Sequence, residues 1–211
     1  MRLTKFGHAC VRLEKDGRRL VIDPGTYTEA AALAGADAVL VSHEHEDHAD
    51  VDQIAAACAA NPQLTVHGPT AWADTLRARL GDAVIGVAPE DTFEAAGFGV
   101  RAVGGRHAEI IDGLPGCPNL GYVVDGIYHP GDSLFVPDAE VEVLLVPVSG
   151  PWLKHRDAIE LLRAIRPARA VPIHDAMLSE LGLANVDAWL EGEGGADYTR
   201  VPLGATVTFS G

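Results

Sequence analysis

Apolar and polar residues alternate along the first part of the chain. Leu3, Val11 and Leu13 are each followed by a polar residue, and an apolar run at 20–22 follows the turn-forming residues 15–18, which include an Asp-Gly pair. Alternation with a period of two places apolar side chains on one face of a strand, and an Asp-Gly pair between two such stretches is typical of a hairpin. We therefore predict antiparallel strands in the first 25 residues.

Beyond residue 38, short apolar runs alternate with stretches of helical periodicity. The run 38–41 is continuous, as in a buried strand. After Asp50, a residue type that caps helix N-termini, apolar residues recur with helical spacing as far as Asn61. The same patterns predict strands at 64–67, 83–87, 98–103, 122–124, 127–128, 143–146 and 170–173, helices near 70–80, 156–165 and 185–190, and a closing hairpin of 199–201 and 206–209.

A dense group of metal-binding residue types follows the apolar run at 38–41. Residues 43–48 read His-Glu-His-Glu-Asp-His and lie between a predicted strand end and a predicted helix start. Neutral imidazoles bind borderline metals such as zinc, and a neighbouring carboxylate can hold a second cation or orient a bound water. The segment therefore predicts a metal site, and its alternative is a solvated charged loop.

Three isolated residues follow other predicted strands in the same way. His107 comes shortly after the strand at 98–103, Asp132 follows the strands at 122–128, and His174 follows 170–173. Because strand-end loops converge on one rim of a layered α/β fold, these residues are expected to approach the histidine-rich segment. Taken alone, each histidine would be an ordinary core or surface residue, and Asp132 a turn residue.

The order of these motifs resembles that of the metallo-β-lactamase superfamily. The match covers nearly the whole chain and includes Asp23 in an Ile-Asp-Pro segment. The Phe-Gly-His segment that ends at His8 and the block 129–133, His-Pro-Gly-Asp-Ser, are similar to the compact branch that contains ascorbate-6-phosphate lactonase. The resemblance implies an α/β fold, an αββα sandwich of two mixed sheets with helices outside, as a single domain over 1–211.

The resemblance also implies two divalent metal ions. Zinc is the expected metal, with manganese or iron as alternatives, since sites of histidine and aspartate admit all three. Two cations ~3.5–4 Å apart can share a hydroxide and stabilise developing oxyanion charge. The implied function is a binuclear metal-dependent hydrolase in which a metal-bound hydroxide cleaves a small ester, lactone or phosphodiester. The implied ligands are His43, His45 and His107 for one metal, Asp47, His48 and His174 for the other, and Asp132 as a bridge.

Several further residues are candidates for supporting roles. Asp47 is expected to orient the hydroxide as well as to bind metal, and Asp23 to orient a histidine ligand from behind. His8 is a candidate catalytic residue, as a substrate contact or proton donor. His129 adjoins the Asp132 motif, and structural packing is an equal alternative to a role in the site. The alternative for Asp23 is a strand-ending turn. Candidate contacts to an anionic substrate are Arg106, Lys154 and His155, the last of which could instead be an exposed helix start.

The composition limits the classes of protein to which the chain is expected to belong. A chain of 211 residues that is 47% hydrophobic suits one domain with a sizeable core. Sixteen Lys and Arg against thirty Asp and Glu give a net charge of −14, which disfavours nucleic acid and leaves a small, anionic molecule as the expected substrate. No run approaches the ~18 apolar residues of a membrane helix, so a cytoplasmic location is expected. Oligomerisation stays open.

Two other functions compete with the small-molecule hydrolase. A nuclease of the ribonuclease Z kind would be expected to carry a basic RNA-binding extension, which this acidic sequence does not show. A non-catalytic metal-binding or regulatory protein would keep its metals for folding, and a structural zinc site usually closes with four protein ligands.

Three scattered cysteines argue against a disulfide framework, and Cys10 and Cys58 are expected in the core. The irregular stretch 104–118 is expected to form a loop over the site.

Overall fold

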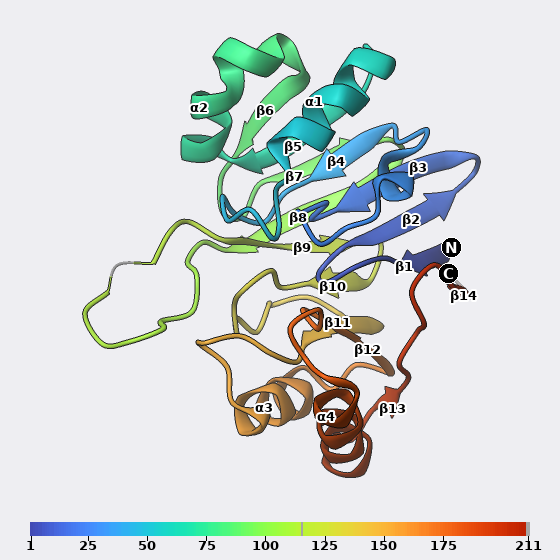
Figure 1. Ribbon diagram of the computed structural model, residues 1–211, viewed down its shortest axis with the longest axis vertical. Coiled ribbons are helices and arrows are strands. Elements are labelled where there is room, and N and C mark those ends of the chain that lie inside the picture. The colour runs from blue at the N-terminus through green and yellow to red at the C-terminus, as the bar shows by residue number, and fades with distance from the viewer. Residues whose placement is uncertain (115, 210–211) are drawn as a thin grey trace.

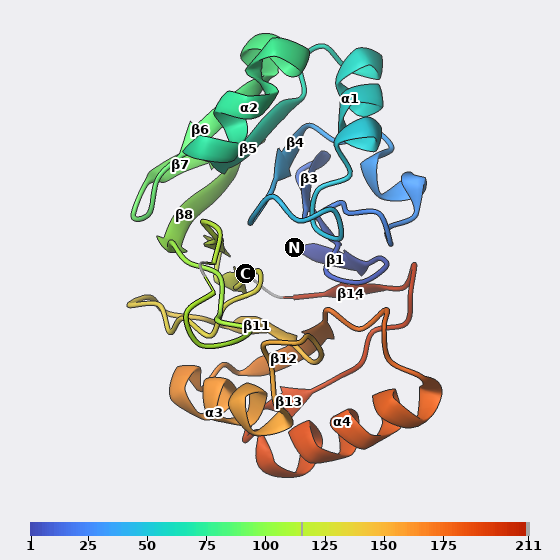
Figure 2. The ribbon, with the colours of Figure 1, turned by 60° about the vertical axis from the view of Figure 1, so that its left-hand side comes forward.

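The computed structural model describes residues 1–114 and 116–209 and contains two seven-stranded sheets. Figures 1 and 2 show the sheets in the middle of the molecule, with helices α1 and α2 outside one sheet and α3 and α4 outside the other. The predicted αββα sandwich is therefore confirmed.

The first sheet is mixed and has the order β14-β1-β2-β3-β4-β5-β6. Strands β1, β2 and β3 pair antiparallel, with β2 and β3 joined by the hairpin predicted at 15–18, and β3 to β6 pair parallel. Parallel neighbours bring the carboxyl ends of β3, β4 and β5 to one edge. The strands are β1 (Arg2–Lys5), β2 (Val11–Lys15), β3 (Arg18–Ile22), β4 (Ala38–Leu40), β5 (Thr65–Pro69), β6 (Val84–Val87) and β14 (Thr206–Thr208).

The second sheet has the order β13-β12-β11-β10-β9-β8-β7. Its strands β7 to β10 form an antiparallel meander, and β10 to β13 pair parallel. Strand β7 has only four residues and was not predicted. The strands are β7 (Thr92–Ala95), β8 (Phe98–Gly104), β9 (Leu120–Val124), β10 (Ile127–His129), β11 (Val143–Pro147), β12 (Arg169–Ile173) and β13 (Asp197–Tyr198).

Two of the helices, α1 and α4, begin at polar side chains that cap them. The Asp50 side chain accepts hydrogen bonds from the backbone nitrogens of Asp52 and Gln53, which confirms it as the cap of α1. The last helix begins earlier than predicted, because the side chain of Ser179 caps it by accepting from the nitrogen of Gly182. No described helix is long and apolar enough to cross a membrane. The helices are α1 (Val51–Ala60), α2 (Thr70–Leu80), α3 (His155–Ile165) and α4 (Glu180–Glu193), with 3-10 turns η1 (Ala30–Leu33) and η2 (Gly81–Ala83).

Three layers of apolar side chains hold the sandwich together. The central layer joins the inner faces of both sheets and includes the fully buried Leu13, Leu40 and Phe98. The other two layers pack α1 and α2 on the first sheet and α3 and α4 on the second. Cys10 is buried in the first of these helical layers and Cys58 packs against it, as expected of small core residues.

The predicted closing hairpin is wrong. Strand β13 pairs parallel with β12 in the second sheet, whereas β14 pairs antiparallel with β1 in the first. The intervening chain crosses between the sheets, and Gly204 donates from its nitrogen to the oxygen of Lys5. Figure 1 shows β14 beside β1 as a result. Alternation predicts that a segment is a strand, but it does not identify the partner strand.

Candidate metal centre

The candidate ligands lie on loops that follow strand ends at one edge of the sandwich. The segment 43–48 follows β4 and makes a single turn before α1, with His48 and Ala49 both donating from nitrogen to the oxygen of His45. His107 follows β8, and Asp132 follows β10. His174 follows β12, so both sheets contribute residues to this edge.

One group of side chains comprises His43, His45, His107 and Asp132. Each offers a ligand atom, and these atoms all lie within 4.8 Å of one another. The His43 Nε2 and His45 Nδ1 atoms face each other at 3.0 Å, and His107 Nε2 lies 3.3 Å from Asp132 Oδ2. Nitrogen lone pairs that converge at this spacing fit the tetrahedral ligand shell of a metal ion. The group contains the three histidines that were predicted to share one metal.

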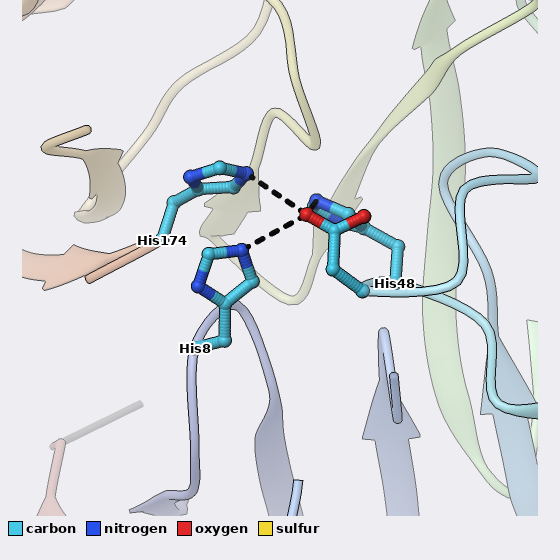
Figure 3. Close-up of side chains that lie close together, drawn as sticks. His8, His48 and His174 are labelled. Atoms are coloured by element: carbon cyan, nitrogen blue, oxygen red, sulfur yellow. Dashed lines mark hydrogen bonds and ion pairs between the residues drawn. The ribbon is translucent and has the colours of Figure 1, made fainter. Parts of the chain in front are cut away.

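A second group comprises His8, Asp47, His48 and His174, whose ligand atoms also lie within 4.8 Å of one another. Figure 3 shows the three histidines pointing toward one another from separate segments of the chain. The Asp47 Oδ2 atom lies 3.2 Å from His8 Nε2 and 3.6 Å from His174 Nε2. Three of these residues are the predicted ligands of the other metal, and His8 is an addition to that set.

Asp132 lies between the two groups. Its Oδ1 atom is 3.0 Å from His48 Nε2 and 3.2 Å from His174 Nε2. Its Oδ2 atom is 3.3 Å from His107 Nε2 and 3.9 Å from His43 Nε2. The carboxylate thus presents one oxygen to each group, which is the geometry that a bridging ligand requires.

Unpaired buried atoms provide an independent test of whether a metal fits. Within residues 1–114 and 116–209, His48 Nε2, His174 Nε2 and Asp132 Oδ1 are buried without a hydrogen-bond partner. Each such atom costs roughly 1–3 kcal/mol when it loses water and gains no partner. A cation placed among these three atoms would satisfy all of them at once. The residues therefore fit a divalent metal ion.

The charges of the buried groups also favour a cation. Burial acts to raise the pKa of Asp132, but His48, His107 and His174 hold that pKa well below its usual range. Burial likewise acts to raise the pKa of Asp23, but His48 and His129 keep it lowered. Both carboxylates therefore stay ionised in the interior. Buried negative charge is retained only where positive charge or a metal compensates it.

Asp23 is fully buried behind the histidines. Its Oδ2 atom lies 2.7 Å from His48 Nδ1, and its Oδ1 accepts from the backbone nitrogen of Ser42 at 2.7 Å. The Ser42 hydroxyl donates to Asp23 at 2.7 Å and lies 2.9 Å from His43 Nδ1, so it can accept from that ring. Asp23 thus contacts one histidine directly and a second through Ser42, the kind of contact that orients metal ligands.

The other predicted residues lie apart from both groups. Arg106 is exposed and pairs with Glu109 at 3.8 Å. Lys154 and His155 are exposed at the start of α3. His129 is fully buried, donates from Nε2 to the oxygen of Ala9 at 2.9 Å, and accepts at Nδ1 from the nitrogen of Gly131 at 3.1 Å. Its hydrogen bonds are therefore complete without a ligand.

Two contacts at the site were not predicted from the sequence. Trp152 is 7% exposed, donates from Nε1 to Asp132 Oδ2 at 3.0 Å, and lies edge-on to His107 and His174. Trp152 follows the strand β11, so the rule that strand ends carry the site could have found it. Ser42 comes immediately after the apolar run at 38–41, where the same rule applies.

The loop after β8 is attached to the site at its two ends. The nitrogen of His107 donates to the oxygen of Cys117 at 3.1 Å, and Cys117 Sγ lies 3.9 Å from His45 Nε2. Figure 1 shows the middle of this loop extending away from the sheets. Its exposed side chains include Ile111 and Leu114, and Pro115 lies outside the described residues.

Comparison with known proteins identifies the family. The profile of the beta-lactamase superfamily domain matches residues 2–174, which is most of the chain. The chain belongs to the metallo-β-lactamase superfamily. The resemblance to that superfamily inferred from the order of the motifs is therefore confirmed.

Individual proteins are similar over most or nearly all of the chain. Protein Rv0786c of Mycobacterium tuberculosis is 37% identical over 216 residues, covering 99% of this chain and 100% of that protein. The UPF0173 metal-dependent hydrolase Ta0764 of Thermoplasma acidophilum is 28% identical and covers 82% of this chain and 83% of its own length. The solved structure of Igni18, a metallo hydrolase of Ignicoccus hospitalis, covers 99% of this chain and 98% of its own with a TM-score of 0.76 and 24% identity.

Proposed function

We propose that this protein is a binuclear metal-dependent hydrolase that cleaves a small ester, lactone or phosphodiester. The observation that carries the proposal is the position of Asp132, which presents one carboxylate oxygen to each group of histidines. The similarity to Ta0764, a metal-dependent hydrolase, supports it. Two divalent cations, with zinc as the expected metal, would supply an activated water and Lewis-acid stabilisation of the substrate oxygen.

The side chains of the protein have separate tasks in this proposal. His43, His45 and His107 would hold one metal, and Asp47, His48 and His174 the other. The indole N–H of Trp152 holds the Asp132 carboxylate in place, and the buried Asp23 holds the His48 ring. Burial acts to raise the pKa of Asp47, but His8, His48 and His174 lower it to about 2, so this carboxylate is ionised at neutral pH.

The size and charge of the substrate follow from the surface. A net charge of −14 repels a long polyanion, whereas two buried cations would attract one small anionic group. The nearby cations Arg106 and Arg156 already pair with Glu109 and Glu160. Attraction of the substrate is therefore assigned mainly to the metals, with Arg106, Lys154 and His155 as auxiliary contacts.

A panel of substrates tests the proposed function. The protein, freed of metal and reloaded with zinc or manganese, is expected to hydrolyse a chromogenic phosphodiester, a small lactone or a simple aryl ester, because an activated water attacks each of these centres. The metal-free protein is the matched control. Product release is followed by absorbance, and by a pH indicator for the lactone.

The same preparation distinguishes the alternatives. Transfer RNA precursor and duplex DNA are expected to stay intact under the same metal conditions. Metal-dependent cutting of the RNA precursor without turnover of any small substrate would replace the proposal with a nuclease of the ribonuclease Z kind. Tight metal binding with no turnover on any of them would favour the non-catalytic protein.

A further inference from the structure

The histidines of the metal centre are of two kinds, which differ in the hydrogen-bond partners of their ring nitrogens. His48 Nδ1 lies 2.7 Å from a carboxylate oxygen of Asp23, and His107 Nδ1 lies 2.6 Å from the backbone oxygen of Ala108. Carboxylate and carbonyl oxygens only accept hydrogen bonds, so each Nδ1 carries a proton. In the neutral ring, Nε2 then keeps its lone pair for a metal.

His8 has the opposite arrangement. The backbone nitrogen of Ala176 donates to His8 Nδ1 at 3.3 Å. A backbone amide only donates, so the proton of the neutral His8 ring is on Nε2. That nitrogen lies 3.2 Å from Asp47 Oδ2, which can accept from it. The buried His129, which faces neither group, has the same pattern of one backbone donor and one acceptor.

The main chain holds His8 in this orientation. The residue is 1% exposed and has a left-handed backbone with φ of 58°. Its carbonyl oxygen accepts from the Lys5 ammonium at 2.7 Å and from the nitrogen of His174 at 3.0 Å. The segment that carries His8 is therefore tied to the segment 174–176, which supplies the donor to Nδ1.

We propose that His8 binds no metal and instead donates its Nε2 proton to Asp47 as a positioning residue. This inference rests on the proposed binuclear site. Its consequence concerns the ligands of the second metal. Asp47, His48, His174 and the shared Asp132 would hold that metal, and any further coordination position would be needed for water or substrate. A ring nitrogen from His8 would compete for such a position, whereas a hydrogen bond from His8 to Asp47 would not.

Magnetic resonance of isotope-labelled histidine tests the inference directly. Correlation of the ring nitrogens with the ring protons identifies which nitrogen carries the proton, and the signals of His8 are assigned by their loss in His8→Gln. We expect His8 Nε2 to keep its proton after saturation with zinc, while His48 and His107 bind through Nε2. Loss of the His8 Nε2 proton on zinc binding would overturn the inference.

Metal analysis of variants gives a second readout. His8→Ala is expected to retain both metals at saturation, with second-site affinity weakened by roughly 10–100-fold, as for other residues that orient ligands. His8→Gln, whose side-chain amide can also donate to Asp47, should recover most of that affinity. His174→Ala is the comparison variant and should lose the second metal. Loss of that metal from His8→Ala as well would identify His8 as a ligand.

The two measurements keep this inference separate from the proposed function. A wild-type protein that binds only one metal would contradict the binuclear hydrolase. If His8 Nε2 kept its proton in that protein, the assignment of His8 as a donor would still hold.

Discussion

Replacement of Lys5 by methionine is expected to lower the free energy of unfolding by about 3 kcal/mol, because it removes a buried charge from its partners. For a chain of this length, that loss corresponds to a fall of roughly 6–12 °C in the melting temperature. Lys5 lies on β1, is 1% exposed, and is among the largest fully buried side chains.

The partners of Lys5 explain the size of this effect. The ammonium donates to the backbone oxygens of Phe6 and His8 and lies 3.4 Å from Asp175 Oδ1. Asp175 keeps a second partner, Arg200, at 2.6 Å. The expected loss is therefore at the lower end of the range for a broken buried ion pair, because the carboxylate is not left alone.

A second lysine provides the matched control. Lys15, on the adjacent strand β2, pairs with Asp125 at 2.7 Å but is partly exposed. Lys15→Met is expected to cost under about 1 kcal/mol, as for other exposed ion pairs. Thermal and denaturant unfolding of both variants measure the difference. Equal stability of the two variants would show that the buried ammonium does not hold the loops of the site together.

Replacement of Asp132 by asparagine is expected to lower kcat/KM by roughly a thousandfold, equivalent to about 4 kcal/mol. The substitution keeps the shape of the side chain but replaces one carboxylate oxygen with an amide nitrogen that has no lone pair for a metal. Because Asp132 presents an oxygen to each group of histidines, the change affects both metal positions.

Steady-state kinetics on the best small substrate measure this effect at saturating metal. Ser133→Ala is the matched control, because Ser133 is adjacent and buried, and its hydroxyl accepts only from the backbone nitrogen of Phe135 among the hydrogen bonds of the described residues. Activity of Asp132→Asn within tenfold of the wild type would remove Asp132 from the centre of the proposed mechanism.

Most of the layered fold could be predicted from local patterns. The hairpin at 15–18, the cap at Asp50 and the continuous strand before His43 follow from the period of apolar residues and from capping chemistry. Pairing between distant segments could not be predicted in the same way. The last strand pairs with the first because of contacts over some 200 residues, and a two-residue strand such as β13 leaves almost no sequence pattern.

The candidate site was predictable only in part for a related reason. The order of the motifs predicts which seven residues are the expected ligands, and the fold places them in two adjoining groups. The contacts that hold these side chains in place depend on tertiary packing. Trp152 reaches Asp132 from the loop between β11 and α3, where the strand-end rule indicates a site residue but not its partner. Ala176 approaches His8 from a segment more than 160 residues further along the chain, and no sequence spacing displays that contact.

Metal content of the purified protein at saturation tests the central claim most directly. Elemental analysis after removal of free metal is expected to give about two ions per wild-type chain, and about one in both His45→Ala and His174→Ala, because each variant disrupts a different site. A single tightly held ion in the wild type, unchanged by His174→Ala, would contradict the binuclear centre.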